Sequence, residues 1–379
     1  MDTALVDRVR RRVAASGAPP TPAGVAAALR DEGGGLRGDV AHVVTALSGE
    51  IVGAGPLAAL LSQSGVTDVL VNGPDEVWID GDDGLARTTV RFADDDAVRR
   101  LAQRLAASAG RRLDAAQPWV DARLPDGVRL HAVLPPLSPA GTCLSLRVPR
   151  RRVFTLAELV AARTVPAEGA ELLHRLVLSR TAFLVSGGTG TGKTTLLSAL
   201  LSLVDPRHRV LLVEDASELR PDLPHVVRLE ARPPNVEGAG AVGLHDLVRL
   251  ALRMRPDRLV VGEVRGAEVV DLLAALNTGH EGGCGTVHAN AAADVPARLE
   301  ALAASAGLAR EALHSQLASA LRVAVHLTRS DGLRRVAEVC VLVRGADGAV
   351  CAVQAWSWDG DAERGTPGPA APALAGLLG

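Results

Sequence analysis

The C-terminal part of the chain alternates short apolar runs with amphipathic segments. From Glu171 onward, the apolar residues of the amphipathic segments recur every three or four positions, which places them on one face of a helix. Strands that alternate with helices are typical of a parallel α/β domain, which we expect over residues 171–358. Its strands are expected over residues 182–186, 209–214, 258–262, 285–288, 323–328, 336–343 and 349–355.

Residues 55–149 have a different pattern, in which short β-rich runs are separated by turn signals. One amphipathic helix is expected over residues 94–109, with Asp94 as its N-cap. The pattern predicts a small α/β domain with a mostly antiparallel sheet. Its strands are expected over residues 66–73, 76–80, 119–124, 128–134 and 142–148.

Three further segments complete the expected organisation. Residues 1–54 have helical patterns and predict a helical N-terminal extension. Residues 150–170 predict a linker that contains a short helix. Residues 359–379 are rich in Pro, Gly and Ala and predict a disordered tail.

The composition narrows the class of protein. An apolar fraction of 47% with 22% charged residues is typical of a globular chain, and a net charge of −2 gives no overall attraction for nucleic acid. The four cysteines lack metal-ligand spacing and, with no recognisable signal peptide, indicate a reducing cytoplasm. No apolar run approaches the ~18 residues of a membrane span, so any membrane contact is expected through a partner.

A glycine-rich segment is the clearest candidate for a ligand site. It lies between an apolar run that predicts a strand and a periodic apolar run that predicts a helix. Residues 186–195 fit the spacing Gly-x-x-x-x-Gly-Lys-Ser/Thr, in which backbone N–H groups converge on phosphate oxygens. Lys193 is the only lysine among the 41 Lys and Arg residues. It stands at the position of the motif whose side chain reaches the phosphates as a compact ammonium, for which an arginine would not serve. The residues expected to bind the nucleotide are Gly187, Gly188, Thr189, Gly190, Thr191, Gly192, Lys193, Thr194 and Thr195, with Thr194 also on Mg²⁺.

Carboxylates follow two further predicted strands. Glu214 and Asp215 come at the end of one strand, where they could polarise a water molecule or hold a metal-bound one. The alternative is an acidic turn that caps the next helix. Glu263 follows Gly262, which stands where a general Walker B strand has Asp.

Two histidines flank a glycine-rich turn. His280 and His288 could suggest a metal, but no third ligand has zinc spacing. A γ-phosphate sensor at a strand end fits better, because a neutral imidazole can donate one hydrogen bond and relay the other to a carboxylate.

These motifs together resemble a known family. Four ordered segments are similar to the Walker A, Asp-box, Walker B and His-box motifs of the VirB11-like type II/IV secretion ATPases: residues 187–194, 213–219, 253–265 and 278–290. The Tad-pilus (CpaF/TadA-type) branch is the most similar, on residues 67–73, 121–127 and 229–235. The resemblance covers roughly residues 55–345, and its departures, such as Cys284, remove no group that the chemistry needs.

The resemblance implies a RecA-like P-loop ATPase domain with a smaller α/β N-terminal domain, and ATP and Mg²⁺ as ligands. Lys193 and Thr194 would hold phosphate and Mg²⁺. Glu214 would orient or activate water and Glu263 would hold the Mg²⁺ shell, or the two would exchange roles. His288 would sense the γ-phosphate, assisted by His280.

The resemblance also implies arginines that neutralise charge in the transition state. The candidates are Arg123, Arg129 and Arg147 in the N-terminal domain, and Arg228, Arg232 and Arg253 from a neighbouring subunit. A surface ion pair is the alternative for each of them.

By this resemblance the protein is a hexameric ATP hydrolase that powers Tad or type IV pilus assembly, or type II/IV secretion. Its expected partner is an inner-membrane platform protein, its expected location is the cytoplasm at that membrane, and no direct nucleic-acid contact is expected. The alternative is a conjugation or DNA-uptake ATPase of the same superfamily, which predicts salt-dependent DNA binding. A nucleotide-gated scaffold with negligible turnover is a second rival, and the pair Glu214 and Glu263 argues against it.

Overall fold

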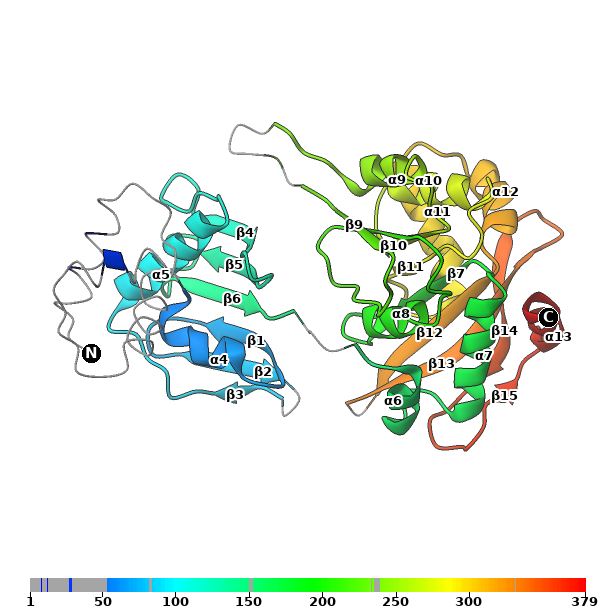
Figure 1. Ribbon diagram of the computed structural model, residues 1–379, viewed down its shortest axis with the longest axis horizontal. Helices are drawn as coiled ribbons and strands as arrows, with labels where there is room; N and C mark the ends of the chain where they lie inside the picture. Colours follow the sequence, from blue (N-terminus) through cyan, green and yellow to red (C-terminus); the bar gives the residue numbers. More distant parts are fainter. Residues whose placement is uncertain are drawn as a thin grey trace. The chain divides into compact units, whose positions relative to one another are not determined.

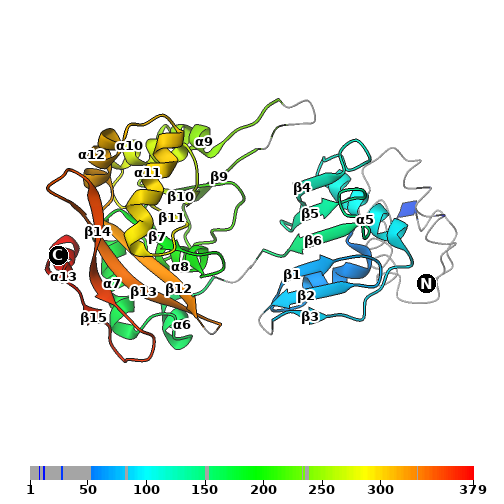
Figure 2. The same ribbon diagram turned by 180° about the vertical axis from the view of Figure 1, so that it is seen from behind.

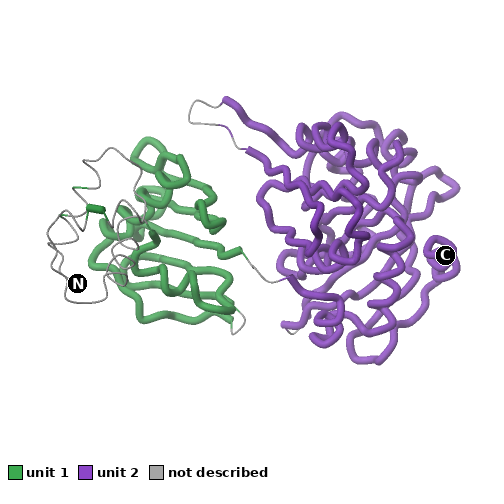
Figure 3. Tube along the Cα trace, in the orientation of Figure 1, with its two compact units in different colours: residues 1–150 green, residues 151–379 purple. Residues whose placement is uncertain are grey.

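The computed structural model describes residues 53–379 except 82–83, 150–152, 233, 235–238 and 331. Before residue 53 it describes Arg8, Arg12, Ala27 and Ala28 alone. The chain divides into two compact units, Met1–Arg150 and Arg151–Gly379 (Figure 3). The helical extension expected over residues 1–54 lies almost wholly outside the described residues.

Unit 1 contains a six-stranded antiparallel sheet in the order β3-β2-β1-β6-β5-β4 (Figure 1). Its strands are β1 (Val66–Val71), β2 (Val77–Gly81), β3 (Ala86–Arg87), β4 (Trp119–Arg123), β5 (Arg129–Val133) and β6 (Cys143–Arg147). The expected antiparallel sheet is therefore confirmed, with the short β3 added to it.

Helices cover one face of this sheet. The main one, α5 (Asp95–Ser108), begins as predicted, because the side chain of Asp94 accepts a hydrogen bond from the N–H of Ala97 at 2.7 Å. Helix η1 (Gly55–Leu57) and helix α4 (Ala58–Ser62) pack into the same buried cluster. Since side chains alternate along a strand, the opposite face of the sheet carries its polar side chains.

Unit 2 contains a nine-stranded sheet in the order β15-β14-β13-β12-β7-β11-β10-β8-β9. The strands from β12 to β9 in this order are parallel, whereas β13, β14 and β15 run antiparallel to their neighbours. The bounds are β7 (Phe183–Gly187), β8 (Val210–Glu214), β9 (Val226–Glu230), β10 (Arg258–Val264), β11 (Cys284–Val287), β12 (Val323–Ser330), β13 (Leu333–Arg344), β14 (Val350–Ser357) and β15 (Thr366–Pro367).

The seven strands expected in this domain are present, but the expected parallel pairing is wrong for the last two. β12, β13 and β14 are joined by short turns, which suit antiparallel hairpins, whereas a parallel connection needs a crossover of a dozen or more residues. The pattern also does not predict β9, an edge strand with no fully buried residue.

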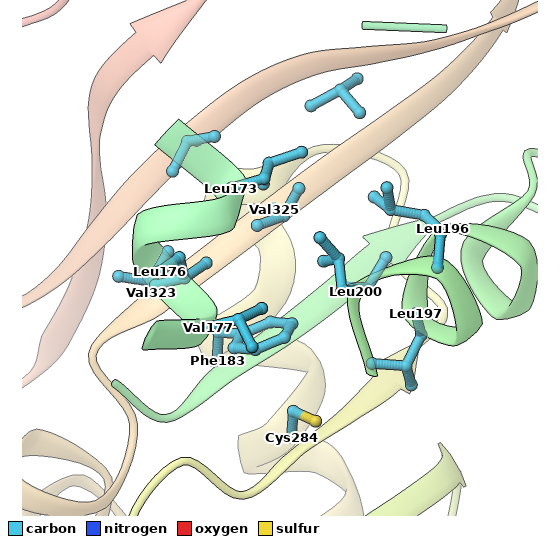
Figure 4. Close-up of a cluster of buried hydrophobic side chains, with 14 of the residues drawn as sticks. Leu173, Leu176, Val177, Phe183, Leu196, Leu197, Leu200, Cys284, Val323 and Val325 are labelled. Carbon is cyan, nitrogen blue, oxygen red and sulfur yellow. The ribbon is translucent and has the colours of Figure 1, made fainter. Parts of the chain in front are cut away.

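Helices cover both faces of the large sheet (Figures 1 and 2). Phe183 and Val185 of β7 belong to one buried cluster and Leu184 to the other, because successive strand residues point to opposite faces. On the first face lie α6 (Leu156–Ala161), α7 (Ala167–Leu178), α8 (Lys193–Leu201) and α13 (Ala371–Leu378), and Figure 4 shows how α7 and α8 pack there against β7. On the second face lie α9 (Leu244–Leu252), α10 (Glu268–Leu276), η2 (Ala292–Asp294), α11 (Val295–Ser305) and α12 (Arg310–Ala320). None of the described helices combines the length and apolar composition that crossing a membrane requires.

The tail, expected to be disordered, is instead ordered and packed. Residues 359–379 form β15 and α13, and Leu374 and Leu378 of α13 are buried in the first cluster. Arg175 of α7 donates a hydrogen bond to the carbonyl of Gly379 at 2.8 Å. Within this Pro/Gly/Ala-rich segment, Leu374, Leu377 and Leu378 are spaced i, i+3 and i+4. They therefore form the apolar face of a short helix.

Most of the expected linker also belongs to unit 2. The side chains of Thr155 and Glu158 form a capping box that starts α6. Leu159 and Val165 are buried in the first cluster, so this segment is part of the core. Residues 150–152 of the expected linker lie outside the described residues.

Candidate nucleotide-binding site

The phosphate-loop motif forms the turn between β7 and α8. Gly190 and Gly192 have φ of 73° and 96°, in the left-handed region that L side chains rarely adopt. At Gly187, with φ of 149°, an added Cβ would lie 2.5 Å from the carbonyl oxygen of Leu327. Thr191 Oγ1 donates to the carbonyl of Gly188 at 3.0 Å and closes the turn. The loop therefore depends on glycine at these three positions.

Lys193 lies inside this turn. Its Nζ donates to the carbonyls of Gly187 at 3.0 Å and Gly188 at 2.8 Å, and it lies 3.3 Å from Nδ1 of His288. The side chain is only 8% exposed, and burial lowers the pKa of Lys193, while the negative charges of Glu263 and Glu218 partly oppose that shift. The ammonium is thus held at the mouth of the loop, where a phosphate would meet it.

His288 connects Lys193 to a carboxylate. Its Nε2 lies 3.0 Å from Oε1 of Glu263. Because an ammonium can only donate, Nδ1 must carry the lone pair and Nε2 the proton, which then points to Glu263. Burial, followed by the charge of Lys193, lowers the pKa of His288 and favours this neutral form. The structure therefore brings Lys193, His288 and Glu263 into one hydrogen-bonded chain.

Glu214, at the end of β8, is 3% exposed. Its Oε1 accepts hydrogen bonds from the backbone N–H groups of Glu218 and Leu219, each at 2.9 Å, while its buried Oε2 finds no partner among the described residues. Desolvation raises the pKa of Glu214 to about 7. The alternative of a helix-capping turn is wrong, because no helix begins after β8 before α9 in the described residues. The neighbouring Asp215 pairs with Arg265 at 2.6 Å.

Gly262 gives Glu214 its space. In the parallel pairing of β8 and β10, Val213 lies beside Val261, so Glu214 lies next to Gly262. A Cβ at residue 262 would lie 2.7 Å from Cγ of Glu214 and 3.2 Å from its Oε1. Thr286 Oγ1 also donates to the carbonyl of Gly262 at 2.6 Å. The departure from the general Walker B pattern thus has a steric reason, which the sequence alone does not reveal.

Two of the residues considered from the sequence have their side chains bonded to backbone carbonyls outside this group. His280 precedes β11 and donates from Nδ1 to the carbonyl of Ala275 at 3.1 Å, whereas His288 follows the opposite end of that strand. Its expected assisting role is therefore wrong, as is a metal shared by the two histidines. Arg232 follows the edge strand β9, and its Nε donates to the carbonyl of Gly240 at 2.7 Å.

The arginines expected in the N-terminal domain form one row across unit 1. Arg123 of β4 is paired with Arg129 of β5, and Arg129 with Arg147 of β6, so all three share the face opposite the core. The guanidinium of Arg129 lies 4.0 Å from the carboxylate of Asp121. The row concentrates positive charge at one end of the sheet.

The residues of unit 2 fit a nucleotide phosphate with its magnesium ion. Lys193, glycines in conformations that a Cβ would disturb, and the hydroxyl of Thr194 at the start of α8 form the donor set that this ligand requires. Mg²⁺ usually keeps several waters and takes only one or two protein carboxylates, so a single carboxylate such as that of Glu263 would be enough to hold it. The described residues contain no group of three or more His, Cys, Asp or Glu side chains that could hold a metal by themselves.

None of the sequence motifs predicts one of the contacts that the loop makes, a hydrogen bond from a distant arginine. Arg334 of β13 donates from Nε to the carbonyl of Gly190 at 2.9 Å. The two residues are 144 positions apart, and the density of arginines around residues 329–335 is the one local hint.

Comparison with known proteins places this geometry in a family. Residues 50–351 match the family described as type II/IV secretion system protein. A putative conjugal transfer protein of Mycobacterium tuberculosis is 60% identical over 320 residues, which cover 83% of this chain and 91% of that protein. The type IV secretion system protein PtlH of Bordetella pertussis is 36% identical over 255 residues, which cover 61% of this chain and 75% of PtlH.

A solved structure supports the same assignment at the level of the fold. The pilus retraction motor PilT with bound ADP aligns with a TM-score of 0.52 at 20% identity, over 78% of this chain and 79% of PilT. The chain has the RecA-like fold of these ATPases. Because the family match covers most of the sequence, including every motif around the phosphate loop, the chain belongs to the type II/IV secretion system protein family.

Proposed function

We propose that the protein is an ATP hydrolase that works as a motor of a secretion or pilus-assembly system. The observation that carries the proposal is the hydrogen-bonded chain Lys193–His288–Glu263 at the mouth of the phosphate loop. The loop after β7, Glu263 in β10 and His288 after β11 meet at the carboxyl edge of parallel strands, where α/β sheets bind their ligands.

The loop residues have the binding role in this proposal. Residues 187–195 would surround the phosphates, with Lys193 donating to them in place of the carbonyls that it now contacts. Thr194 and Glu263 would hold Mg²⁺, which supplies positive charge to the phosphate oxygens. To exchange its contact with Lys193 for one with the γ-phosphate, His288 would have to donate from Nδ1. It would therefore take up a proton there and become an imidazolium, while Nε2–H keeps its bond to Glu263.

Glu214 would act on the attacking water. A carboxyl group with a pKa of about 7 accepts a proton more readily at neutral pH than an ordinary glutamate. Its Oε2 is the atom that we assign to the water, because Oε1 is already occupied by two backbone N–H groups.

Arginines and further subunits complete the proposed machine. Arg123 and Arg129 of unit 1 would neutralise phosphate charge, and Arg232 would do so from a neighbouring subunit of a hexamer. ATP-driven movement of one unit against the other would transmit force to an inner-membrane platform protein, which would keep the protein at the cytoplasmic membrane.

A conjugation ATPase is the second candidate, favoured by the name of the mycobacterial relative, a putative conjugal transfer protein. The resemblance to the Tad-pilus branch at residues 229–235 favours pilus assembly instead. Binding of labelled double-stranded DNA over a series of salt concentrations separates them. Affinity that falls steeply with salt supports conjugation, and absence of binding supports the pilus or secretion role.

The ATPase proposal is tested by the hydrolysis rate of MgATP and by the oligomeric state of full-length protein. Lys193→Ala is expected to lose binding and turnover. Glu263→Gln is expected to bind MgADP but lose at least about 100-fold in turnover, because transition-state charge stabilisation is lost. Glu281→Gln is the matched control, since this 71%-exposed carboxylate lies before β11, beyond the opposite end of the strand from His288.

Ring-sized assemblies with nucleotide and the expected order of variants support the proposal. A wild-type protein that remains monomeric and inactive with its membrane partner contradicts the motor role. Equal turnover in Glu263→Gln and Glu281→Gln contradicts the assigned site.

A further inference from the structure

The β12–β13 hairpin packs against the outside of the phosphate loop. The carbonyl of Leu327 lies so close to Gly187 that a side chain there would collide with it. Cδ of Arg334 lies 3.3 Å from the position that a Cβ of Gly192 would take. These contacts come from the strand next to β7 and from the one beyond it, so the hairpin supports the loop along its length.

Arg334 makes the hydrogen bond that fixes the loop to this hairpin. Its Nε donates to the carbonyl of Gly190 at 2.9 Å in a solvent-exposed hydrogen bond, and the residue as a whole is half-buried. The Gly190–Thr191 peptide is trans, so its C=O and N–H point in opposite directions. Because the C=O points to Arg334, the N–H of Thr191 points away from the hairpin.

A loop with this many glycines needs such a support. Gly187, Gly188, Gly190 and Gly192 lose more conformational freedom on ordering than any other residue type would. Contacts that fix them before a ligand arrives reduce the entropy lost on binding. The bond to Arg334 comes from outside the loop and does not use the N–H groups that a phosphate would need.

We propose that Arg334 is a positioning residue that holds the Gly190–Thr191 peptide with its N–H directed at a nucleotide phosphate. This inference rests on the proposed nucleotide binding. Arg334 acts through the loop backbone and does not contact the nucleotide. The proposal differs from a direct charge effect, in which the guanidinium would attract the phosphates from a distance.

Two substitutions separate the hydrogen bond from the charge. In Arg334→Gln, the amide nitrogen stands where Nε stood, so the donor to Gly190 is kept while the charge is lost. In Arg334→Met, the unbranched stem that packs at Gly192 is kept while both the donor and the charge are lost. Arg344→Gln is the matched control, because Arg344 lies at the other end of β13, is exposed, and donates from Nε to the carbonyl of Gly348 at 3.2 Å instead of to the loop.

The experiment measures two quantities on each full-length variant. The first is the affinity for MgADP, by calorimetric titration. The second is amide hydrogen exchange of residues 187–195 without nucleotide. Arg334→Met is expected to weaken MgADP binding by about 10- to 100-fold, the loss typical of a hydrogen bond with a charged donor. Its loop amides are expected to exchange faster, while those of β7 remain protected.

The expected order is that Arg334→Gln stays within a few fold of wild type and Arg344→Gln equals wild type in both measurements. Equal losses in Arg334→Gln and Arg334→Met would overturn the positioning role, because the charge alone would then matter. Unchanged exchange in Arg334→Met would also overturn it. If wild type does not bind MgADP, the proposed function fails, and the exchange data still decide whether Arg334 holds the loop.

Discussion

Gly262 and Glu214 show how one absent side chain sets the position of another. The two residues are neighbours on parallel strands, and the carboxylate of Glu214 occupies the volume next to the α-carbon of Gly262. Asp at residue 262, as in the general Walker B pattern, would displace the buried side chain. Gly262 has no positive φ, so its role is close approach rather than backbone freedom.

Gly262→Ala is therefore expected to destabilise unit 2 by about 1–3 kcal/mol, the usual cost of overpacking a buried position. In a Glu214→Ala background Cγ is gone, so the same substitution is expected to cost far less. The free energies of unfolding of wild type, both single variants and the double variant, measured in urea, give the coupling between the two residues.

Gly285→Ala is the control for this cycle. Its added Cβ would lie 2.5 Å from the backbone carbonyl of Val261, a contact that does not involve Glu214. Its cost is expected to be the same in both backgrounds. If Gly262→Ala also costs the same with and without the Glu214 side chain, the shared space is not the reason for glycine.

At the scale of elements, α13 closes the first core of unit 2. The helix is short, but Leu374 is 3% exposed and packs in the cluster that contains α7 and β7. β15 pairs with β14 just before it and fixes the approach of the chain. The C-terminal residues thus cover apolar surface that would otherwise face water.

Leu374→Ala is expected to lower the free energy of unfolding of unit 2 by about 2–4 kcal/mol, the range for a buried leucine truncated to alanine. Leu178→Ala, at a side chain that is 59% exposed on α7, is expected to change it by less than about 0.5 kcal/mol. Thermal or urea unfolding of the full chain checks both. A Leu374→Ala variant as stable as Leu178→Ala would show that α13 contributes nothing to the core.

The sequence predicts the central strands well because each of them is a continuous apolar run, a signal contained in a few neighbouring residues. β7 and β8 are buried at every residue, and a parallel strand covered on both faces must be apolar throughout. The phosphate-loop motif is likewise a local pattern. Strand ends carrying Glu263 and His288 could be named from the sequence, but their hydrogen bond could not, because it depends on strand order and register.

The missed features depend on long-range contacts. β9 lacks a buried residue and α13 lies in a Pro/Gly/Ala-rich segment, so neither has a strong periodic signal. The reason for Gly262 and the bond between Arg334 and Gly190 involve segments far apart in sequence. His280 was misassigned because proximity in sequence around a glycine-rich turn does not imply proximity across a strand.

At the scale of the whole molecule, the chain combines a RecA-like unit with a smaller antiparallel unit, and each has its own core. The smaller unit carries the row Arg123–Arg129–Arg147 on the face of its sheet opposite that core. Three like charges in adjacent positions repel one another. Two carboxylates lie beside the row, because Asp121 lies 4.0 Å from Arg129 and Asp68 of β1 is paired with Arg147.

If Arg129 has the proposed role, Arg129→Gln is expected to lower MgATP turnover by about 10- to 1,000-fold, because the guanidinium that would neutralise phosphoryl-transfer charge is lost. The stability of unit 1 is expected to change by less than about 0.5 kcal/mol, since the side chain is 43% exposed. Arg87→Gln on β3 of the same sheet is the control, with wild-type turnover expected. Wild-type turnover in Arg129→Gln would exclude Arg129 from the proposed catalytic role.

Burial of the lone lysine has a practical consequence. Amine-directed reagents usually label many surface lysines, but in this chain the one ε-amine lies in the phosphate loop and is 8% exposed. Its lowered pKa increases the fraction of unprotonated, nucleophilic amine at a given pH. Acylation of Lys193, followed by mass spectrometry, would therefore give a single-site measure of whether the loop is covered, without any engineered label.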